Sequence, residues 1–179
     1  MLTVPAFVWR GGFFYRAVLT GGAVGVALGA LSWLDSGFWL SGLGVLVILG
    51  VLMGIVTARR MDRLWPEAAN ISGADRVAVV RAARRGERVG DPRLATAVAT
   101  YRRALHAAAD SARMIRWLLV VVLIVALATA LWDSVSGSVN NTVASVIYLV
   151  LALLELFWWP RWVRTLLVNA DRSTAISVQ

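Results

Sequence analysis

Four long apolar stretches alternate with polar segments along the chain. They run from Ala17 to Leu34, Gly37 to Ala58, Ile115 to Trp132 and Val139 to Trp159. Each is close to the roughly 17 to 25 residues that a helix needs to cross a hydrocarbon core of about 30 Å. The pattern therefore predicts an all-α membrane protein with four transmembrane helices, arranged as two hairpins over residues 17–58 and 115–159.

The polar segments complete the expected organisation. We predict an N-terminal interfacial segment over residues 1–16, a basic helical hairpin over 59–114 and a C-terminal tail over 160–179. Hydrophobic residues make up 59% of the chain and its mean hydropathy is +0.72, whereas soluble domains have about 45 to 50% apolar residues. The composition therefore agrees with a chain that needs a bilayer.

The central polar segment begins with a short predicted helix. Ser72 is suited to cap a helix over Gly73–Arg85, which Gly86 would end. Arginines surround this helix except along one apolar stripe, which we assign to Val77, Val80, Ala74 and Ala78.

A second helix is predicted after it. Asp91 suits the N-cap and Pro92 the first helical position, and neither Gly nor Pro follows before Gly137. This helix is therefore expected to be continuous with the third span and to pack on the first as a hairpin. Its apolar stripe recurs at three- or four-residue intervals, at Leu94, Val98, Tyr101, Leu105 and Ala108 or Ala109.

All eighteen basic residues are arginines, and they lie only in the N-terminal segment, between Arg59 and Arg116, and in the C-terminal tail. The links between spans one and two and between spans three and four contain none. Under the positive-inside rule, both termini and the central segment are expected in the cytoplasm of a multi-pass protein of the cell inner (plasma) membrane. Pro160 is expected to end or kink span four, which would leave Arg161 to Leu167 at the inner interface.

The central segment carries an excess of positive charge. The thirteen arginines from Arg59 to Arg116 outnumber the six carboxylates of the same stretch by seven. The excess is consistent with a topogenic, lipid-facing loop, with binding of anionic lipids, or with an acidic protein partner. Nucleic acid is disfavoured, because no recognition-helix or RNA-binding pattern accompanies the charge. The candidate lipid or partner surface consists of Arg76, Arg81, Arg84, Arg85, Arg88, Arg102 and Arg103.

The first two spans carry glycines at four-residue spacing. Gly21, Gly25 and Gly29 lie on one face of the first span, and Gly50 and Gly54 on one face of the second. Small residues at this spacing let helix backbones approach closely in lipid. The two faces could pack on each other, or one of them could dock a partner subunit.

Glu155 is an ionisable residue within the fourth apolar stretch. A carboxylate at this depth is costly unless it is paired, protonated or hydrated. An intramolecular pair with Arg113, Arg116 or Arg16 would satisfy it. A contact between subunits or a proton relay are the functional alternatives, although the span offers few other polar groups for a transport pathway.

The sequence offers no basis for catalysis. There is no cysteine, and the single histidine, His106, has Asp110 four residues later. Two ligands do not make a metal site, so this pair is interpreted as a polar surface pair. No phosphate-binding loop or nucleophile with a base is present. We therefore expect no enzyme activity, no metal and no cofactor.

One stretch resembles a motif of small uncharacterised actinobacterial multi-pass membrane proteins. It runs from Ile71 to Glu87 and continues at Asp91-Pro92-Arg93-Leu94-Ala95, so it covers about 25 of 179 residues and does not specify an activity. One such protein with a known role is an accessory subunit of a mycobacterial Mce-type lipid importer. This chain is similar to it in kind, being small, multi-pass and arginine-rich. The absence of lysine also suggests an actinobacterial, GC-rich genome.

Two classes of function follow. The first is a non-catalytic accessory or stabilising subunit of a larger integral membrane complex, for which the resemblance implies an Mce-type lipid importer. The second is a small transporter or channel that self-associates, so that Glu155 is repeated around an axis of a homo-oligomer. The two classes differ in whether a different chain or a second copy covers the membrane-facing surface.

Overall fold

The computed structural model describes residues 2, 4–114, 120–121, 123–125, 127–129, 131–132 and 139–178, and these residues form helices and turns without a strand. Eight of the eighteen residues of the predicted third span, including its first five, lie outside the described residues, and with them the predicted continuity of the second hairpin helix into that span. The described helices are α1 (Phe13–Ser36), α2 (Trp39–Leu64), α3 (Gly73–Arg85), α4 (Ala95–Met114), α6 (Val139–Leu153) and α7 (Trp159–Val178).

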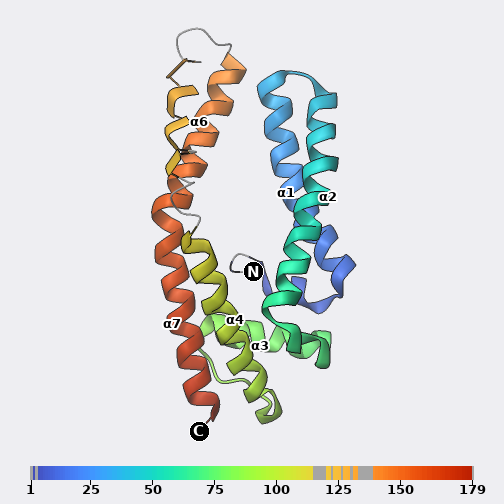
Figure 1. The fold of residues 1–179 in the computed structure, drawn as a ribbon, viewed down its shortest axis with the longest axis vertical. Coiled ribbons are helices and arrows are strands. Elements are labelled where there is room, and N and C mark those ends of the chain that lie inside the picture. The colour runs from blue at the N-terminus through green and yellow to red at the C-terminus, as the bar shows by residue number, and fades with distance from the viewer. Residues whose placement is uncertain are drawn as a thin grey trace.

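Three helices of the described chain are long and apolar enough to cross a membrane. They are Phe13–Ser36, Trp39–Leu64 and the helical stretch Ser145–Ser177. The first two form an antiparallel pair joined by a tight turn, and Figure 1 shows them side by side. Gly37 ends α1 in the left-handed conformation with φ 68°, and its N–H donates to the carbonyl of Trp33 at 2.8 Å. A residue with a side chain would be strained at this φ.

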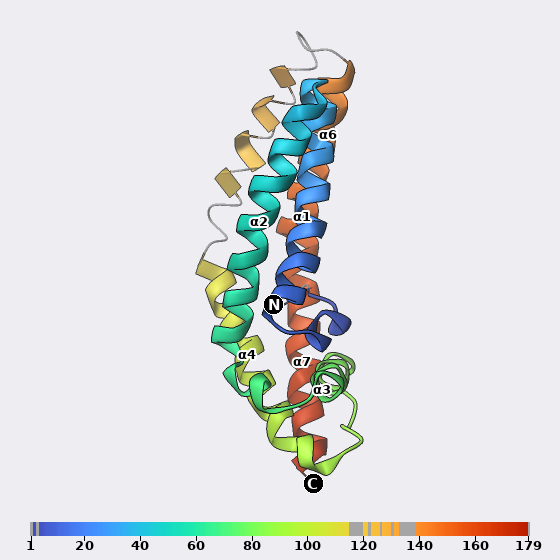
Figure 2. The same cartoon turned by 90° about the vertical axis from the view of Figure 1, so that its right-hand side faces the viewer.

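The third of these helices runs along most of the molecule. A short π-helical turn, η4 (Leu154–Trp158), joins α6 to α7, so the helix continues from Val139 to Val178, or about 60 Å at 1.5 Å per residue. Figures 1 and 2 show its upper part beside α1 and its lower part among α3 and α4. Of the two outcomes expected at Pro160, an end of the helix or a kink, the end is therefore wrong, and the backbone irregularity is the π-turn just before the proline.

The polar segments assemble into one domain at the end of the molecule opposite the α1–α2 turn. This arginine-rich domain comprises residues 4–10, 59–114 and 159–178. Its α3 lies across the long axis, horizontal in Figure 1 and viewed end-on in Figure 2. The short helix η1 (Ala6–Arg10) packs beside it, η2 (Pro66–Asn70) contacts α2 and α4, and η3 (Pro92–Leu94) leads into α4.

The capping residues of α3 and of the segment that leads into α4 are as predicted. The Ser72 hydroxyl accepts from the N–H of Asp75 at 3.1 Å, and α3 ends before Gly86, which has φ 71°. The Asp91 carboxylate accepts from the N–H of Arg93 at 2.9 Å, with Pro92 opening η3. Both helix starts therefore have a side chain that satisfies an N–H group otherwise left without a partner.

The core of the arginine-rich domain combines five parts of the sequence. The predicted stripe of α4 is buried, whereas the predicted stripe of α3 is partly wrong, because Ala74 and Ala78 are exposed. The buried residues of α3 are Val79, Val80, Ala82 and Ala83. The other contributions come from the N-terminal segment, the end of α2 with its following turn, and α7, and they include Leu2, Val8, Trp9, Met61, Trp65 and Ala170.

Helix α7 contains most of the predicted C-terminal tail. It packs against α3 and α4 within the domain, which the sequence pattern did not predict. The Ser173 hydroxyl donates to the carbonyl of Glu87 at 2.6 Å, and the Asn169 amide donates to the carbonyl of Arg84 at 2.8 Å. These bonds satisfy carbonyls at and just beyond the end of α3, so the predicted hairpin is part of a three-helix arrangement.

Candidate functional site around Glu155

The predicted glycine faces meet each other within the α1–α2 pair. A Cβ atom placed on Gly21 would lie 2.3 Å from the carbonyl oxygen of Gly50, and one on Gly25 would lie 2.7 Å from that of Leu46. Gly54 packs in the same way against Ala17. The structure thus brings together Gly21, Gly25, Gly29, Gly50 and Gly54, and adds Gly42, which lies opposite Gly29.

Arg16 forms an ion pair with a residue other than Glu155. Its side chain is 6% exposed and forms an ion pair with Asp62 at 2.7 Å. The guanidinium also lies over the ring of Trp9, with 5.6 Å from Cζ to the centroid. The prediction that Arg16 could neutralise Glu155 is therefore wrong, because Arg16 ties the start of α1 to the end of α2. Arg116 and the side chain of Arg113, the other two predicted partners, lie outside the described part of the chain.

Three of the seven arginines predicted as a binding surface contribute to the fold instead. Arg84 donates to the carbonyls of Leu2 and Val4 at 3.0 and 2.6 Å, and Arg76 donates to the carbonyl of Gly11 at 3.4 Å. Partial burial, followed by the charge of Arg16, lowers the pKa of Arg76, while the charge of Asp62 opposes the shift. Arg102 binds Asp171. The remaining four are exposed: Arg81, Arg85, Arg88 and Arg103.

Glu155 is exposed on the surface of the long helix, in the second position of η4. It forms neither a hydrogen bond nor an ion pair with any residue that the structure describes. Its neighbours one turn before and after it are apolar and also exposed, with Leu151 at 49% and Trp158 at 60%. The carboxylate therefore lies in an apolar surface at a depth where the sequence places hydrocarbon.

The backbone at this position departs from a regular α-helix. The N–H of Trp159 donates to the carbonyl of Leu154, five residues back, which defines the π-turn. Pro160 has no N–H, and its ring would collide with the preceding turn of a regular helix. The wider turn makes room for that ring, and the Arg161 guanidinium donates to the carbonyl of Phe157 at 2.7 Å. Single π-turns of this kind occur often at functional sites.

Aromatic side chains follow the π-turn. The ring centroids of Trp158 and Trp162 are 6.4 Å apart and stacked, and those of Trp159 and Trp162 are 5.3 Å apart. Trp159 and Trp162 are half-buried against the arginine-rich domain, whereas Trp158 faces outward. Sequence reasoning identified Glu155 and the tryptophans but missed the π-turn, for which Pro160 shortly after an intramembrane carboxylate was the available signal.

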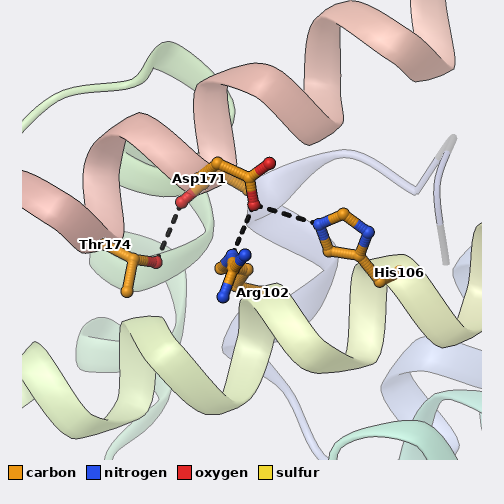
Figure 3. A network of polar contacts seen from close by, with 5 residues as sticks. Arg102, His106, Asp171 and Thr174 are labelled. Atoms are coloured by element: carbon orange, nitrogen blue, oxygen red, sulfur yellow. Dashed lines mark hydrogen bonds and ion pairs between the residues drawn. The ribbon is translucent and has the colours of Figure 1, made fainter.

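His106 pairs across helices, not along its own helix as predicted. Its Nε2 atom lies 3.0 Å from Oδ1 of Asp171 on α7, and Arg102 donates to the same oxygen, as Figure 3 shows. Asp110 is exposed and lies outside this network. Desolvation raises the pKa of Asp171, but the hydrogen bonds and charges of Arg102 and His106 lower it more, so the pKa lies below its usual 3.8. The cluster therefore fastens α7 to α4.

Replacing Asp171 by asparagine should lower the free energy of unfolding at pH 7 by about 1 kcal/mol, since the pair is half-exposed. Because the folded pKa is depressed, this stability is fully present above pH 3.8 and is lost as the pH falls below it. Thermal unfolding of both proteins between pH 7 and pH 3 measures the difference. Asp110→Asn is the matched control and should change nothing, and a difference for Asp171→Asn that stays constant with pH would contradict this account.

Among the described residues, no group of three or more histidine, cysteine, aspartate or glutamate side chains is placed to hold a metal ion. Comparison of the chain with protein-family models, with curated proteins and with solved structures found no match in any of the three. The function is therefore argued from the geometry around Glu155.

Proposed function

We propose that the chain is a non-catalytic accessory or stabilising subunit of a larger integral membrane complex, and that a partner helix docks on the surface around Glu155. The observation that carries the proposal is an exposed carboxylate in an apolar helix, without a partner among the described residues. A charged carboxylate at the centre of a bilayer costs roughly 2.5 to 3.5 kcal/mol on insertion scales, and Glu155, four residues before the end of the fourth apolar stretch, carries a smaller cost of the same kind. A donor group from another chain would remove that cost.

The other surfaces of the membrane-spanning helices are less suited to a partner helix than the surface around Glu155. The glycine faces of α1 and α2 pack on each other, and the apolar groove of about 330 Å³ that remains along their seam has no ionisable side chain in its lining. The long helix exposes Leu151, Leu154 and Phe157 to a half or more of their full extent. An apolar patch around a single polar group is typical of helix association in lipid, where the polar group supplies specificity and packing supplies attachment.

The proposed setting is the cell inner membrane, with four spans and with the arginine-rich domain in the cytoplasm. The support for this orientation is the distribution of the eighteen arginines, none of which lies between positions 16 and 59 or between positions 116 and 161. Anionic lipid headgroups are the proposed partners of exposed arginines next to the spans, at roughly 1 kcal/mol for each. These arginines are Arg59 and Arg60 at the end of α2, and Arg161 and Arg164 at the start of α7.

An Mce-type lipid importer is the complex that we propose to test first, on the basis of the resemblance in size, spans and arginine content. The experiment is purification of a tagged copy from its native membrane in mild detergent, with mass spectrometry of the chains that co-purify. We expect other integral membrane proteins in stoichiometric amounts. Recovery of the chain alone at monomer mass would contradict the proposal.

Glu155→Gln tests the proposed position of the contact. This change keeps the size of the side chain and removes its charge, and losing one member of a desolvated charge pair costs about 2 to 5 kcal/mol. We therefore expect partner recovery to fall more than tenfold, with the melting temperature of the isolated chain unchanged. Glu67→Gln, which alters an exposed carboxylate outside the spans, should retain the partner. Self-association alone, with ion flux in vesicles that Glu155→Gln abolishes, would favour the transporter or channel alternative.

A further inference from the structure

A cavity of 660 Å³ opens between three helical segments near the α1–α2 turn. Its lining residues are Asp35 at the end of α1, Ser145 and Tyr148 in α6, and Ile124, Val125, Ala128, Thr129 and Trp132. Its volume is within the range of about 300 to 1,000 Å³ that is typical of small-molecule sites. Glu155 is not among its lining residues. The cavity is therefore separate from the surface on which the proposed function depends.

The lining combines one carboxylate with aromatic and aliphatic side chains. Asp35 lies at the end of α1, and Tyr148 of α6 lines the same cavity, together with Thr129 and Ser145. Trp132 supplies a second aromatic ring, and an aliphatic wall is formed by Ile124, Val125 and Ala128. The polar groups and the apolar wall together match a ligand that has a small polar head and a hydrocarbon chain.

The carboxylate of Asp35 determines which charge the polar head of the ligand should carry. No arginine or lysine occurs in the sequence between positions 16 and 59 or between positions 116 and 161, so no basic side chain from the apolar stretches accompanies Asp35. An anionic head would meet the carboxylate without compensation, whereas an ammonium group would neutralise it. Tryptophan and tyrosine rings also attract ammonium and quaternary ammonium groups through their faces.

We infer that this cavity binds an amphiphile with an ammonium head, in which the head lies between Asp35, Tyr148 and Trp132 and the hydrocarbon chain lies along the aliphatic wall. Two sources have this chemistry. One is a zwitterionic bilayer lipid with an ethanolamine or choline head, and the other is a soluble lipophilic amine. In either case the site is independent of partner docking and should be present in the isolated chain.

Binding can be measured on the purified full chain by native mass spectrometry and by thermal shift. Decyltrimethylammonium should bind and raise the melting temperature, whereas decyl sulfate, with the same chain and the opposite charge, should not. Phosphatidylethanolamine should be retained in preference to phosphatidylglycerol if the source is the bilayer. Binding of decyltrimethylammonium without retention of phosphatidylethanolamine would assign the site to a soluble amine.

Asp35→Asn should weaken decyltrimethylammonium binding by about tenfold, as expected for the loss of one charge-assisted contact. Asp110→Asn, which neutralises an exposed carboxylate in α4, should bind as the unaltered chain does. Trp132→Leu should weaken the quaternary ammonium more than a primary amine of the same chain length, and it tests the site even if Asp35→Asn does not fold. Equal binding of decyl sulfate, or unchanged binding by both cavity variants, would overturn the inference.

Discussion

Replacing Gly21 by alanine is expected to separate α1 from α2, whereas the same replacement at the adjacent Gly22 should leave the pair intact. The new Cβ atom at Gly21 would lie 2.3 Å from the carbonyl oxygen of Gly50 and 2.9 Å from the Cα atom of Gly54. Both are backbone atoms, so the overlap can be relieved only by moving a helix. Overpacking of this kind costs typically 1 to 3 kcal/mol, and we expect about 3 kcal/mol here.

Gly22 is a close control because it lies in the same helix and the same turn. Its Cβ would meet no atom within 4 Å, so Gly22→Ala should leave stability unchanged or raise it slightly. The chain has no cysteine, which allows a pair of cysteines introduced across α1 and α2 to report their proximity by crosslinking. Lower crosslinking and a lower melting temperature for Gly21→Ala alone are the expected result. Equal losses in both variants would show that the contact is not specific.

The residue pattern was sufficient to predict the local structure. Helix starts at Ser72 and Asp91 and the end at Gly86 were predicted correctly, because capping depends on groups within a few residues of each other. The buried stripe of α4 was also predicted, since one face of that helix is consistently apolar. In α3 the predicted stripe was partly wrong, because alanines occur on several faces and only the packing of neighbours decides which are buried.

Contacts between distant segments were not predictable in the same way. The burial of Trp9 and the use of Arg84 as a donor to the N-terminal segment join residues about eighty positions apart. An arginine that satisfies internal carbonyls and one that faces solvent have the same sequence signature. The charge excess therefore suggested one basic surface of seven arginines. In the structure Arg76, Arg84 and Arg102 make contacts within the protein, and the other four are exposed.

The continuation of the helix through Pro160 has a physical explanation. A proline disfavours the regular helix before it, which led to the expectation that the span ends there. In the structure a π-turn precedes the proline and accommodates its ring. Helix α7 then continues and packs against α3 and α4, so its side chains are buried as those of a separate tail would not be. Tertiary packing thus outweighs the local cost. The π-turn also contains Glu155. The same local irregularity therefore lets the helix continue past Pro160 and lies at the candidate site.

Replacing Trp65 by alanine should unfold or loosen the arginine-rich domain while leaving the α1–α2 pair assembled. The Trp65 side chain is 1% exposed, and its ring centroid lies 5.1 Å from that of Trp9 and 4.8 Å from that of Tyr101. Its Nε1 donates to the hydroxyl of Thr100 at 2.9 Å. Removing a buried tryptophan costs about 3 to 5 kcal/mol, and Trp65→Phe should lose less because a ring still fills most of the space.

The two large effects should be separable in location, because the glycine contacts hold the membrane-spanning pair and Trp65 joins the end of α2 to α4 and the N-terminal segment. Hydrogen exchange of α3 and α4 should accelerate in Trp65→Ala, while the introduced cysteines in α1 and α2 still crosslink. Trp39→Ala, at a tryptophan that is 61% exposed, controls for loss of an aromatic ring. If Trp65→Ala also abolished the crosslink, the pair and the domain would form one cooperative unit, and the glycine contacts would be insufficient to hold the pair on their own.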